Sequence, residues 1–225
     1  MSIAHDSVID VYLPPPSDPD WLLAVDDAML LVNKPAGLLS VPGRGEEKQD
    51  CVLSRVQVVF PEALVVHRLD MATSGLLLLA RGEQMQRQFS RLFRERQVEK
   101  YYLAVVAGQV AAEPGSIDLP LICDWPNRPR QKVDFDIGKP SLTRFCREAY
   151  DPLSDCSRVR LEPVTGRTHQ LRVHLAALGH PILGDVLYAA EHAQRAPRLL
   201  LHAAMLAFPH PLTGALCRFE AAAAF

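Results

Sequence analysis

Apolar and polar positions follow each other along this chain in blocks that predict more short strands than helices. Apolar runs bounded by turn-forming residues predict strands at 21–26, 29–33, 64–66, 76–80, 101–107, 142–150, 158–163, 199–208 and 216–221. Apolar residues that recur at helical spacing predict helices at 51–60, 83–95 and 168–178. Hairpin-like links and the absence of internal repeats favour an α+β fold, in which helices pack on a mixed sheet.

The boundaries of two predicted helices follow from local residues. Asp50 fits the N-cap position of the helix at 51–60, and Pro61 ends that helix. The Thr-Gly turn at 165–166 leads into the helix at 168–178, which Gly179 ends. The residues expected on the buried faces are Val52, Val56 and Val59 in the first helix and Leu171, Leu175 and Leu178 in the other.

The helix at 83–95 is the clearest amphipathic segment of the chain. Its apolar side carries Met85, Phe89, Leu92 and Phe93. Its opposite side carries Arg87, Arg91 and Arg94. A basic stripe of this kind is usually a solvated helix face, and we interpret it so, with contact to a nucleic acid as the alternative.

The composition is that of an ordinary globular protein. The chain has 225 residues, of which 48% are hydrophobic and 22% are charged, so it is long enough to bury a core. The N-terminal residues lack the basic region and the long apolar stretch of a signal peptide, and no apolar run approaches a membrane span. We therefore expect a cytoplasmic location and no membrane partner.

Cysteine and histidine spacing argues against a disulfide framework and against a metal site. The five cysteines are widely separated and include no Cys-x-x-Cys pair, which favours reduced thiols. His169 and His174 lie five residues apart without the glutamate of the zinc protease motif, so structural or polar site roles are more typical of them. We expect no metal ion.

The stretch at 65–75 combines two apolar runs with a polar loop between them, which predicts a strand, a loop and a strand. The loop holds Asp70 at the end of a strand, next to His67 and Arg68, and a Thr-Ser-Gly turn follows it. An aspartate before a turn usually forms an Asx turn or a cap. The loop alone therefore does not indicate catalysis.

Five segments together resemble the RluA family of RNA pseudouridine synthases, and they stand in the order of that family. They are Asn-Lys-Pro-Ala-Gly-Leu at 33–38, His-Arg-Leu-Asp-x-x-Thr-Ser-Gly at 67–75, Lys-Tyr-Tyr-Leu-Ala at 100–104, Gly-Arg-Thr-His-Gln-Leu-Arg-Val-His at 166–174 and His-Pro-Ile-Leu-Gly-Asp at 180–185. The resemblance covers about residues 20–225. The segment Cys-Asp-Trp-Pro-Asn-Arg-Pro at 123–129 is similar to a subgroup that modifies both ribosomal and transfer RNA.

The resemblance implies the pseudouridine synthase fold, an α+β structure whose central, mostly antiparallel mixed sheet is crossed by a cleft. It also implies an isomerase that needs no cofactor, because uracil is detached from C1′ of its ribose, turned and rejoined through C5. One ionised carboxylate held at the sugar is enough for this chemistry. Asp70 matches the invariant aspartate of the family, and attack on the sugar, attack on the base and assistance at C2′ remain open as its role.

Two further residues receive substrate-binding roles from the resemblance, and a third, Arg68, receives one from its position two residues before Asp70. Arg172 pairs with Asp70 and keeps its carboxylate ionised. Tyr102 stacks on the target base; strand alternation alone does not decide between it and Tyr101, and the motif register selects Tyr102. Arg68 fills the space that a flipped uridine leaves.

The resemblance implies RNA partners, namely a stem-loop of 23S rRNA and the anticodon stem-loop of some tRNAs. We expect the protein to be a monomer. The net charge of −2 restricts any RNA surface to a patch. Residues 120–140 form a proline-rich loop or hairpin in which Trp125 lies near Arg128, Arg130 and Lys132. A stacking surface beside phosphate-binding charge suits RNA, and the alternative is a stiff hairpin with Trp125 packed in the core.

The N-terminal residues 1–20 contain Pro14, Pro15, Pro16 and Pro19 and little apolar periodicity, so we expect a tail or a lead-in strap. Many relatives place a small RNA-binding domain ahead of the catalytic domain, and these residues are too few to form one. We therefore expect residues 21–225 to be the catalytic domain, with no separate N-terminal RNA-binding domain.

Three other functions stay open at the level of sequence. One is a non-catalytic RNA-binding module of the same fold, which would not need Asp70, Tyr102 and Arg172 together. Another is a synthase that acts on ribosomal RNA only. The last is a hydrolase of small nucleosides that uses Asp70 with His67 or His169.

Overall fold

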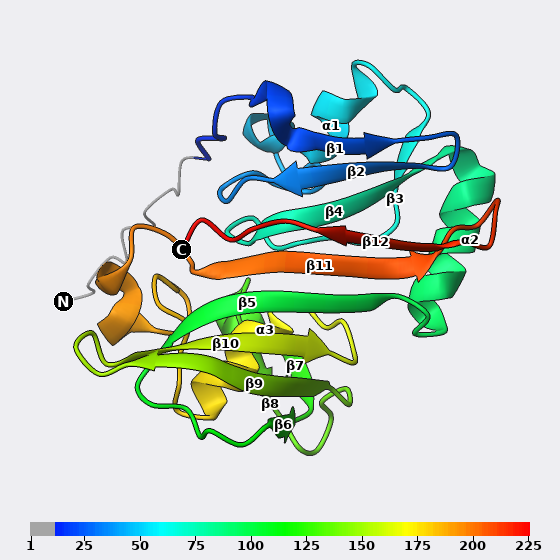
Figure 1. The fold of residues 1–225 in the computed structure, drawn as a ribbon. Coiled ribbons are helices and arrows are strands. Elements are labelled where there is room, and N and C mark those ends of the chain that lie inside the picture. Colours follow the sequence, from blue (N-terminus) through cyan, green and yellow to red (C-terminus); the bar gives the residue numbers. More distant parts are fainter. Residues whose placement is uncertain (1–11) are drawn as a thin grey trace.

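A computed structural model describes residues 12–225, and its centre is one twisted ten-stranded sheet (Figure 1). The strand order is β1-β2-β4-β11-β5-β10-β9-β6, with β12 paired to β11 and β3 paired to β4. The strands are β1 Leu22–Val25, β2 Met29–Lys34, β3 Ala63–Val65, β4 Ser74–Arg81, β5 Glu99–Ala107, β6 Gly115–Asp118, β9 Leu142–Asp151, β10 Cys156–Pro163, β11 Leu201–Pro209 and β12 Leu216–Glu220. Neighbours pair antiparallel except β4 and β11, so the predicted α+β fold with a mostly antiparallel mixed sheet is confirmed.

The remaining elements of the described residues are three α-helices, four short 3-10 helices and a small hairpin. The α-helices are α1 Val52–Gln57, α2 Gly82–Arg94 and α3 Gln170–Ala177, and 3-10 helices cover Pro19–Trp21, Glu46–Lys48, Trp125–Asn127 and Ala190–Arg195. Strands β7 (Leu121–Cys123) and β8 (Gln131–Val133) pair only with each other among the named strands and form a hairpin in the predicted proline-rich region. We call this unit the β7–β8 hairpin.

Strand β4 is buried on both faces because a helix covers each of them. Its residues Leu76 and Leu78 pack against Phe89 of α2, whereas Leu77 and Leu79 pack with the α1 side of the sheet. Double burial explains why this strand is a continuous apolar run and does not alternate with polar residues. The loop that carries Asp70 therefore leads directly into a buried central strand.

The second half of the sheet is covered by α3. Residues Leu171 and Leu175 of this helix lie fully or nearly buried against β5 and β10, in a cluster that includes Val159 and Leu161. Almost the whole helix is buried, including the polar Gln170, Arg172 and His174. The first turn of α3 is thereby held at the sheet, opposite the loop that follows β3.

Helix α1 differs from the prediction. It begins at Val52, and its N-cap is Cys51, whose Sγ accepts the Ser54 N–H at 3.3 Å while the Ser54 hydroxyl oxygen accepts the Cys51 N–H at 2.9 Å. Asp50 is instead ion-paired with Arg55 at 2.7 Å. The predicted cap was wrong because Asp50 pairs with Arg55 and Cys51 caps the helix, and the predicted length was wrong because the helix ends at Gln57.

Two predicted core positions and one strand also differ. Val59 lies beyond the end of α1 and is 70% exposed, and Leu178 follows the last turn of α3 and is 40% exposed. Strand β6 was not predicted, because its residues Gly115–Asp118 lack a run of apolar side chains and pair at the sheet edge with β9.

The part of the predicted tail that the structure describes is attached to the rest of the chain. The Tyr12 hydroxyl donates to the Asp50 carbonyl at 2.8 Å and accepts from the Leu39 N–H at 3.0 Å. Arg55 Nη2 donates to the carbonyl of Pro15 at 2.7 Å. Residues 1–11 of that tail lie outside the described residues.

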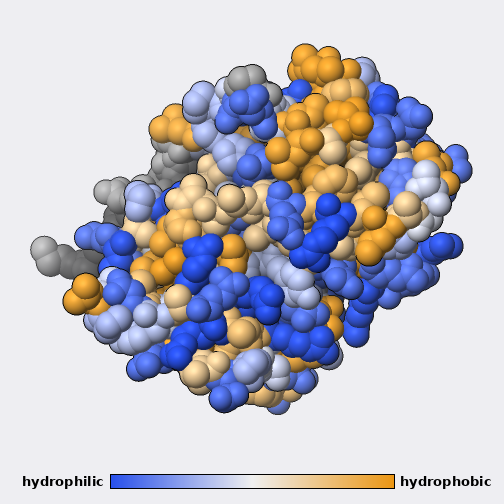
Figure 2. Space-filling model, viewed as in Figure 1, coloured by the Kyte–Doolittle hydropathy of each residue, from blue (hydrophilic) through white to orange (hydrophobic). Residues whose placement is uncertain are grey.

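The sheet face shown in Figure 2 is mainly hydrophilic over β9 and β10 and carries apolar residues near β1. Strand β1 has alternating burial, with Leu23 and Val25 each 45% exposed. Single apolar residues of this kind are normal on a globular surface. Among the described residues, no helix is long and apolar enough to cross a membrane.

The parallel contact between β4 and β11 requires a glycine. Gly75 is paired with Ala203, has φ +110°, and a Cβ at this position would overlap the Ala203 backbone. Gly75→Ala combines left-handed strain with overpacking, so we expect it to lower the free energy of unfolding by about 3 kcal/mol. Urea unfolding of both proteins measures this difference.

Gly214→Ala is the matched control, because Gly214 has φ +72° and no atom within 4 Å of the added Cβ. We expect this variant to lose only the conformational part, about 1 kcal/mol. Equal losses in the two variants would contradict a close approach of β11 at Gly75.

Candidate active site

A narrow cleft of about 110 Å³ brings together residues from distant parts of the chain. The loop between β3 and β4 contributes Arg68 and Asp70, strand β5 contributes Tyr102, and α3 contributes Arg172. These are the four residues predicted at the centre of the site. The three predicted basic residues of the β7–β8 hairpin do not line this cleft.

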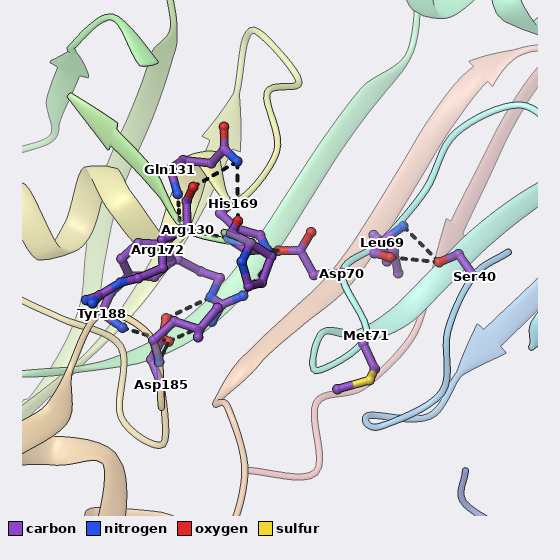
Figure 3. Close-up of polar contacts among 12 residues, drawn as sticks. Ser40, Leu69, Asp70, Met71, Arg130, Gln131, His169, Arg172, Asp185 and Tyr188 are labelled. Carbon is purple, nitrogen blue, oxygen red and sulfur yellow. Dashed lines mark hydrogen bonds and ion pairs between the residues drawn. The ribbon is translucent and has the colours of Figure 1, made fainter. Parts of the chain in front are cut away.

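The Asp70 loop is fixed by hydrogen bonds on both sides of the aspartate. Before it, the Ser40 hydroxyl donates to the Leu69 carbonyl at 2.8 Å and accepts the Leu69 N–H at 3.1 Å (Figure 3). After it, the Met71 carbonyl accepts the Gly37 N–H at 2.8 Å. The segment after β2 therefore holds the backbone on which Asp70 sits.

Lys34 stabilises the same loop from inside the protein. It is fully buried, and its Nζ donates to the carbonyls of Pro35, Leu38 and Met71 at 2.9, 2.7 and 3.0 Å. Burial lowers the pKa of Lys34 to about 7, although the Asp70 carboxylate acts in the opposite direction. Lys34 belongs to one of the motifs of the sequence, but no role was predicted for it. Its position at the end of a strand, directly before Pro35, is the sequence feature that could have indicated a structural role.

Arg172 connects two carboxylates. Its Nε and Nη2 each donate to Asp185 at 2.7 Å, in a bidentate pair, and its Nη1 lies 3.7 Å from Asp70 Oδ2. The side chains of Arg172 and Asp185 are 5% and 1% exposed, whereas that of Asp70 is 26% exposed. Burial opposes the charge of Arg172, but Asp185 and then Asp70 outweigh it and raise its pKa.

The partner of Arg172 that sequence reasoning missed is therefore Asp185. It comes from the His-Pro-Ile-Leu-Gly-Asp segment, where Gly184 has φ +74° and passes so close to the Arg198 backbone that a Cβ would overlap it. Asp185 Oδ1 also accepts the backbone N–H groups of Leu187 and Tyr188. The carboxylate is thus built into a turn, and it orients the guanidinium toward the cleft.

The two tyrosines of β5 point to opposite faces of the sheet, as strand alternation requires. Tyr102 lines the cleft, and burial, followed by the nearby Asp70 carboxylate, raises the pKa of its phenol. Tyr101 lies on the other face, where the Arg160 guanidinium is 5.3 Å from its ring centroid. The cleft thus contains a neutral aromatic ring opposite the carboxylate.

His67 is turned away from the site chemistry. Its Nε2 accepts the Leu78 N–H at 3.0 Å, and its ring stacks on Phe93 of α2 with 4.7 Å between centroids. Burial, and then Lys100, lower its pKa to about 3. Its neutral imidazole thus links the loop to β4 and is not positioned as a base for Asp70.

His169 approaches the carboxylate from the start of α3. Its Nε2 lies 4.0 Å from Asp70 Oδ2, and its Nδ1 lies 2.7 Å from the hydroxyl of Tyr188. That hydroxyl also accepts the N–H of Gln131 in the β7–β8 hairpin at 2.7 Å. Tyr188 was missed because no pattern in the sequence marks a lone tyrosine three residues after an aspartate.

The β7–β8 hairpin presents an exposed aromatic and basic surface. Trp125 is 65% exposed, which excludes the alternative in which it packs in the core. The Arg128 guanidinium lies 4.5 Å from the Trp125 ring centroid, and that of Arg130 lies 5.6 Å from the Tyr188 ring centroid. Lys132 is paired with Asp134 at 3.3 Å.

The basic stripe of α2 is partly neutralised on its own helix. Arg87 pairs with Glu83 at 3.2 Å, and Arg91 lies 3.8 Å from Glu95. Both pairs are largely exposed, which is the arrangement of a solvated helix face.

A larger cavity of about 370 Å³ lies on the opposite side of the same strands. It is lined by Ser74 and His202, the sequence neighbours of the cleft residues Thr73 and Leu201, and neighbouring strand residues face opposite sides. None of the predicted site residues lines it. Within residues 12–225, no group of three or more His, Cys, Asp or Glu side chains is arranged to hold a metal ion.

Comparison with known proteins assigns this chain to a family. The family model described as RNA pseudouridylate synthase matches residues 28–177, two thirds of the chain, and includes Asp70, Tyr102 and Arg172. The chain belongs to this family. It is an RNA pseudouridine synthase, an isomerase, and its fold is the pseudouridine synthase fold expected from the sequence.

Curated relatives match the synthase over almost its whole length. The dual-specificity RNA pseudouridine synthase RluA of Escherichia coli strain K12 is 53% identical over 215 residues, 94% of this chain and 97% of the relative. The protein of the same name from Yersinia pestis is 51% identical over 205 residues, 91% of this chain and 99% of the relative. The solved structure of human RNA pseudouridylate synthase domain containing 1 superposes with a TM-score of 0.76 at 29% identity, covering 93% of this chain and 86% of that chain.

The neutral His67 makes the stability of the synthase depend on pH. Its pKa in the folded protein is about 3, so the unfolded chain takes up a proton as the pH falls through its ordinary value near 6.5 while the folded protein does not. The free energy of unfolding should therefore fall below pH 6.5, and this histidine contributes at most about 2 kcal/mol between pH 7 and pH 5. His67→Gln keeps an acceptor for Leu78 and should reduce this loss, as urea unfolding at both pH values measures.

His192→Gln, on the surface 3-10 helix Ala190–Arg195, is the control and should lose as much stability as the unchanged protein between the two pH values. His67→Gln should also keep pseudouridine formation at neutral pH. Loss of activity with an intact fold would show that His67 takes part in the reaction.

Proposed function

We propose that this synthase converts uridines to pseudouridine in two RNA classes, a stem-loop of 23S rRNA and the anticodon stem-loop of some tRNAs. Support for two classes comes from curated relatives called dual-specificity, to which the chain is similar over 94% of its length. The observation that carries the catalytic proposal is the position of Asp70, in a cleft with Tyr102 and with Arg172 at 3.7 Å. Residues 21–225 act as the catalytic domain.

In this proposal Asp70 supplies the reactive carboxylate. The bond between N1 of uracil and C1′ of ribose breaks, the base turns, and a bond from C5 to C1′ forms. The proton lost from C5 is balanced by the proton gained at N1, so no oxidant, reductant or external group is consumed. A positioned carboxylate can act by nucleophilic catalysis, and a restricted cleft keeps water from competing.

Arg172 and Tyr102 prepare the site for this chemistry. The guanidinium of Arg172 is held by Asp185, so it faces Asp70 without having to reorganise when the substrate arrives. The raised pKa of Tyr102 keeps its phenol neutral, and a neutral ring is suited to stack on uracil.

Arg68 and the β7–β8 hairpin bind the RNA around the target nucleotide. Flipping a base out of a stem-loop costs a few kcal/mol, and the exposed Arg68 at the cleft entrance can occupy the space that the base leaves. Trp125 with Arg128, Arg130 and Lys132 combines stacking with phosphate contacts, which suits an RNA loop. In this proposal the synthase acts as a monomer in the cytoplasm, and every residue that lines its cleft comes from the one chain.

Asp70→Asn tests the catalytic proposal. The amide keeps the shape of the carboxylate but removes its charge, so we expect RNA binding within about threefold of the unchanged protein and loss of pseudouridine formation by at least about 10⁴-fold. Cells that lack the protein, complemented with either form, are then compared by mapping pseudouridines in ribosomal and transfer RNA.

Asp27→Asn, an exposed aspartate in the turn between β1 and β2, is the matched control and should restore all modified positions. Surviving activity of Asp70→Asn would contradict the catalytic role. Modification restored in ribosomal RNA alone would reduce the proposal to one RNA class, and release of free uracil would indicate a hydrolase.

Replacing Arg128, Arg130 and Lys132 together with Ala tests the hairpin surface. Removing up to three phosphate contacts should weaken RNA binding and reduce the slope of log Kd against log salt by about 2 to 3. Fluorescence anisotropy with a stem-loop RNA at several salt concentrations gives both values.

The control for this variant replaces Arg87, Arg91 and Arg94 on α2 with Ala, so it removes the same number of positive charges from a different surface. We expect the α2 variant to bind RNA with an almost unchanged salt slope. If the two triple variants behaved alike, net charge and not the hairpin would determine the affinity.

A further inference from the structure

Three polar groups form a chain from the β7–β8 hairpin to the catalytic loop (Figure 3). The Gln131 N–H donates to the Tyr188 hydroxyl oxygen at 2.7 Å, and that hydroxyl lies 2.7 Å from His169 Nδ1. His169 Nε2 in turn lies 4.0 Å from Asp70 Oδ2. The only side chain in this series that reaches the carboxylate is therefore His169.

The protons of this chain can be assigned from its donors. A backbone N–H can only donate, so Tyr188 accepts from Gln131, and burial raises the pKa of Tyr188 so that the phenol keeps its proton. Nδ1 of His169 is the partner that can accept this proton. A neutral His169 then carries its own proton on Nε2, the nitrogen that faces Asp70.

Burial keeps the His169 ring neutral at physiological pH. Burial lowers its pKa, and Arg172 acts in the same direction, whereas Asp70 and Asp185 act against them with a smaller total effect. Its side chain is 10% exposed. His169 is thus a buried N–H donor and not a second cation beside Arg172.

The backbone of His169 is strained in a way that points to a function for its side chain. It is the N-cap residue of α3 with φ +54° and ψ +16°, a left-handed conformation that costs about 1 kcal/mol for a residue with a side chain, and its ring makes no cap hydrogen bond. The ring instead packs edge-on against Tyr188, with 5.6 Å between centroids. The side chain is directed to Tyr188 and Asp70 and not to the helix terminus.

We propose that His169 is a positioning residue for Asp70. When a nucleotide fills the cleft, the Nε2–H group of His169 donates a hydrogen bond to Asp70 Oδ2. The Tyr188 hydroxyl donates to Nδ1 of His169 and so keeps the imidazole proton on Nε2. Arg172 Nη1 approaches Asp70 Oδ2 at 3.7 Å, so the two donors leave Oδ1 of Asp70 free to face the nucleotide. Closure of about 1 Å brings His169 within hydrogen-bond distance. Tyr188 is hydrogen-bonded to Gln131 of the β7–β8 hairpin. Binding of RNA to this hairpin is therefore coupled to the orientation of the Asp70 carboxylate.

Two variants separate the two halves of this role. In His169→Asn the amide oxygen can take the place of Nδ1 and accept from Tyr188, but no donor reaches Asp70; asparagine also tolerates the left-handed backbone. In His169→Gln the amide nitrogen can take the place of Nε2 and donate to Asp70. A misplaced carboxylate can reduce the rate about 100-fold, so we expect kcat to fall between about 10-fold and 100-fold in His169→Asn with KM within about threefold, and to recover largely in His169→Gln.

Tyr188→Phe tests the coupling, because it keeps the ring and removes only the hydroxyl. We expect kcat to fall about 10-fold, and the double variant His169→Asn with Tyr188→Phe to be no slower than His169→Asn alone, since both changes interrupt the same chain. The assay uses the full protein and a stem-loop RNA under saturating and limiting substrate. Urea unfolding and RNA affinity of each variant show whether the fold and the binding surface remain intact.

This inference rests on Asp70 as the catalytic group, and the two can fail separately. An active Asp70→Asn would contradict the proposed function itself. If Asp70→Asn is inactive, then an unchanged kcat in His169→Asn, or multiplicative losses in the double variant, would overturn the role of His169. A raised KM with an unchanged kcat in His169→Asn, in Tyr188→Phe and in the double variant would also overturn it, because the chain of polar groups would then only support RNA binding.

Discussion

One guanidinium group determines the geometry of the active site. Arg172 is held by two short bonds to the buried Asp185 and reaches Asp70 with the nitrogen that remains. Breaking a buried pair of this kind by removing one partner is strongly destabilising, because it leaves an uncompensated charge. The turn that carries Asp185, the first turn of α3 and the loop between β3 and β4 therefore have to keep their relative positions, and the fold supplies that constraint.

The sheet provides the rigidity that this arrangement requires. Strand β4 is buried on both faces and is joined to β11 in the parallel pair at Gly75, which fixes the end of the Asp70 loop. Lys34 fixes the middle of the loop through the Met71 carbonyl, and Ser40 fixes its beginning through Leu69. A partly exposed carboxylate is thus carried by a backbone that buried hydrogen bonds hold on both sides, which favours catalysis by positioning.

Periodicity along the chain predicted α2 and the apolar strands of the sheet, because burial on one or both faces leaves a direct trace in the sequence, whereas the edge strand β6 lacks that trace. The matching motifs brought Asp70, Tyr102 and Arg172 to attention, and their common cleft follows only from the folded chain. Asp185, Tyr188 and the Cys51 cap were not predicted, since each depends on a contact between segments or on competition for one side chain. Asp50 shows why such contacts escape prediction. Its residue type suits an N-cap, but its carboxylate forms an ion pair with Arg55, five residues later.

The pairing of Arg172 with two carboxylates has an electrostatic consequence for substrate entry. The buried Arg172–Asp185 pair balances its own charge, so Asp70 supplies the negative charge of this group. The other charged residues that line the cleft, Arg68, Lys100 and Arg167, are all basic. The lining therefore attracts the phosphates on either side of an extruded uridine, while its negative charge is confined to a single carboxylate.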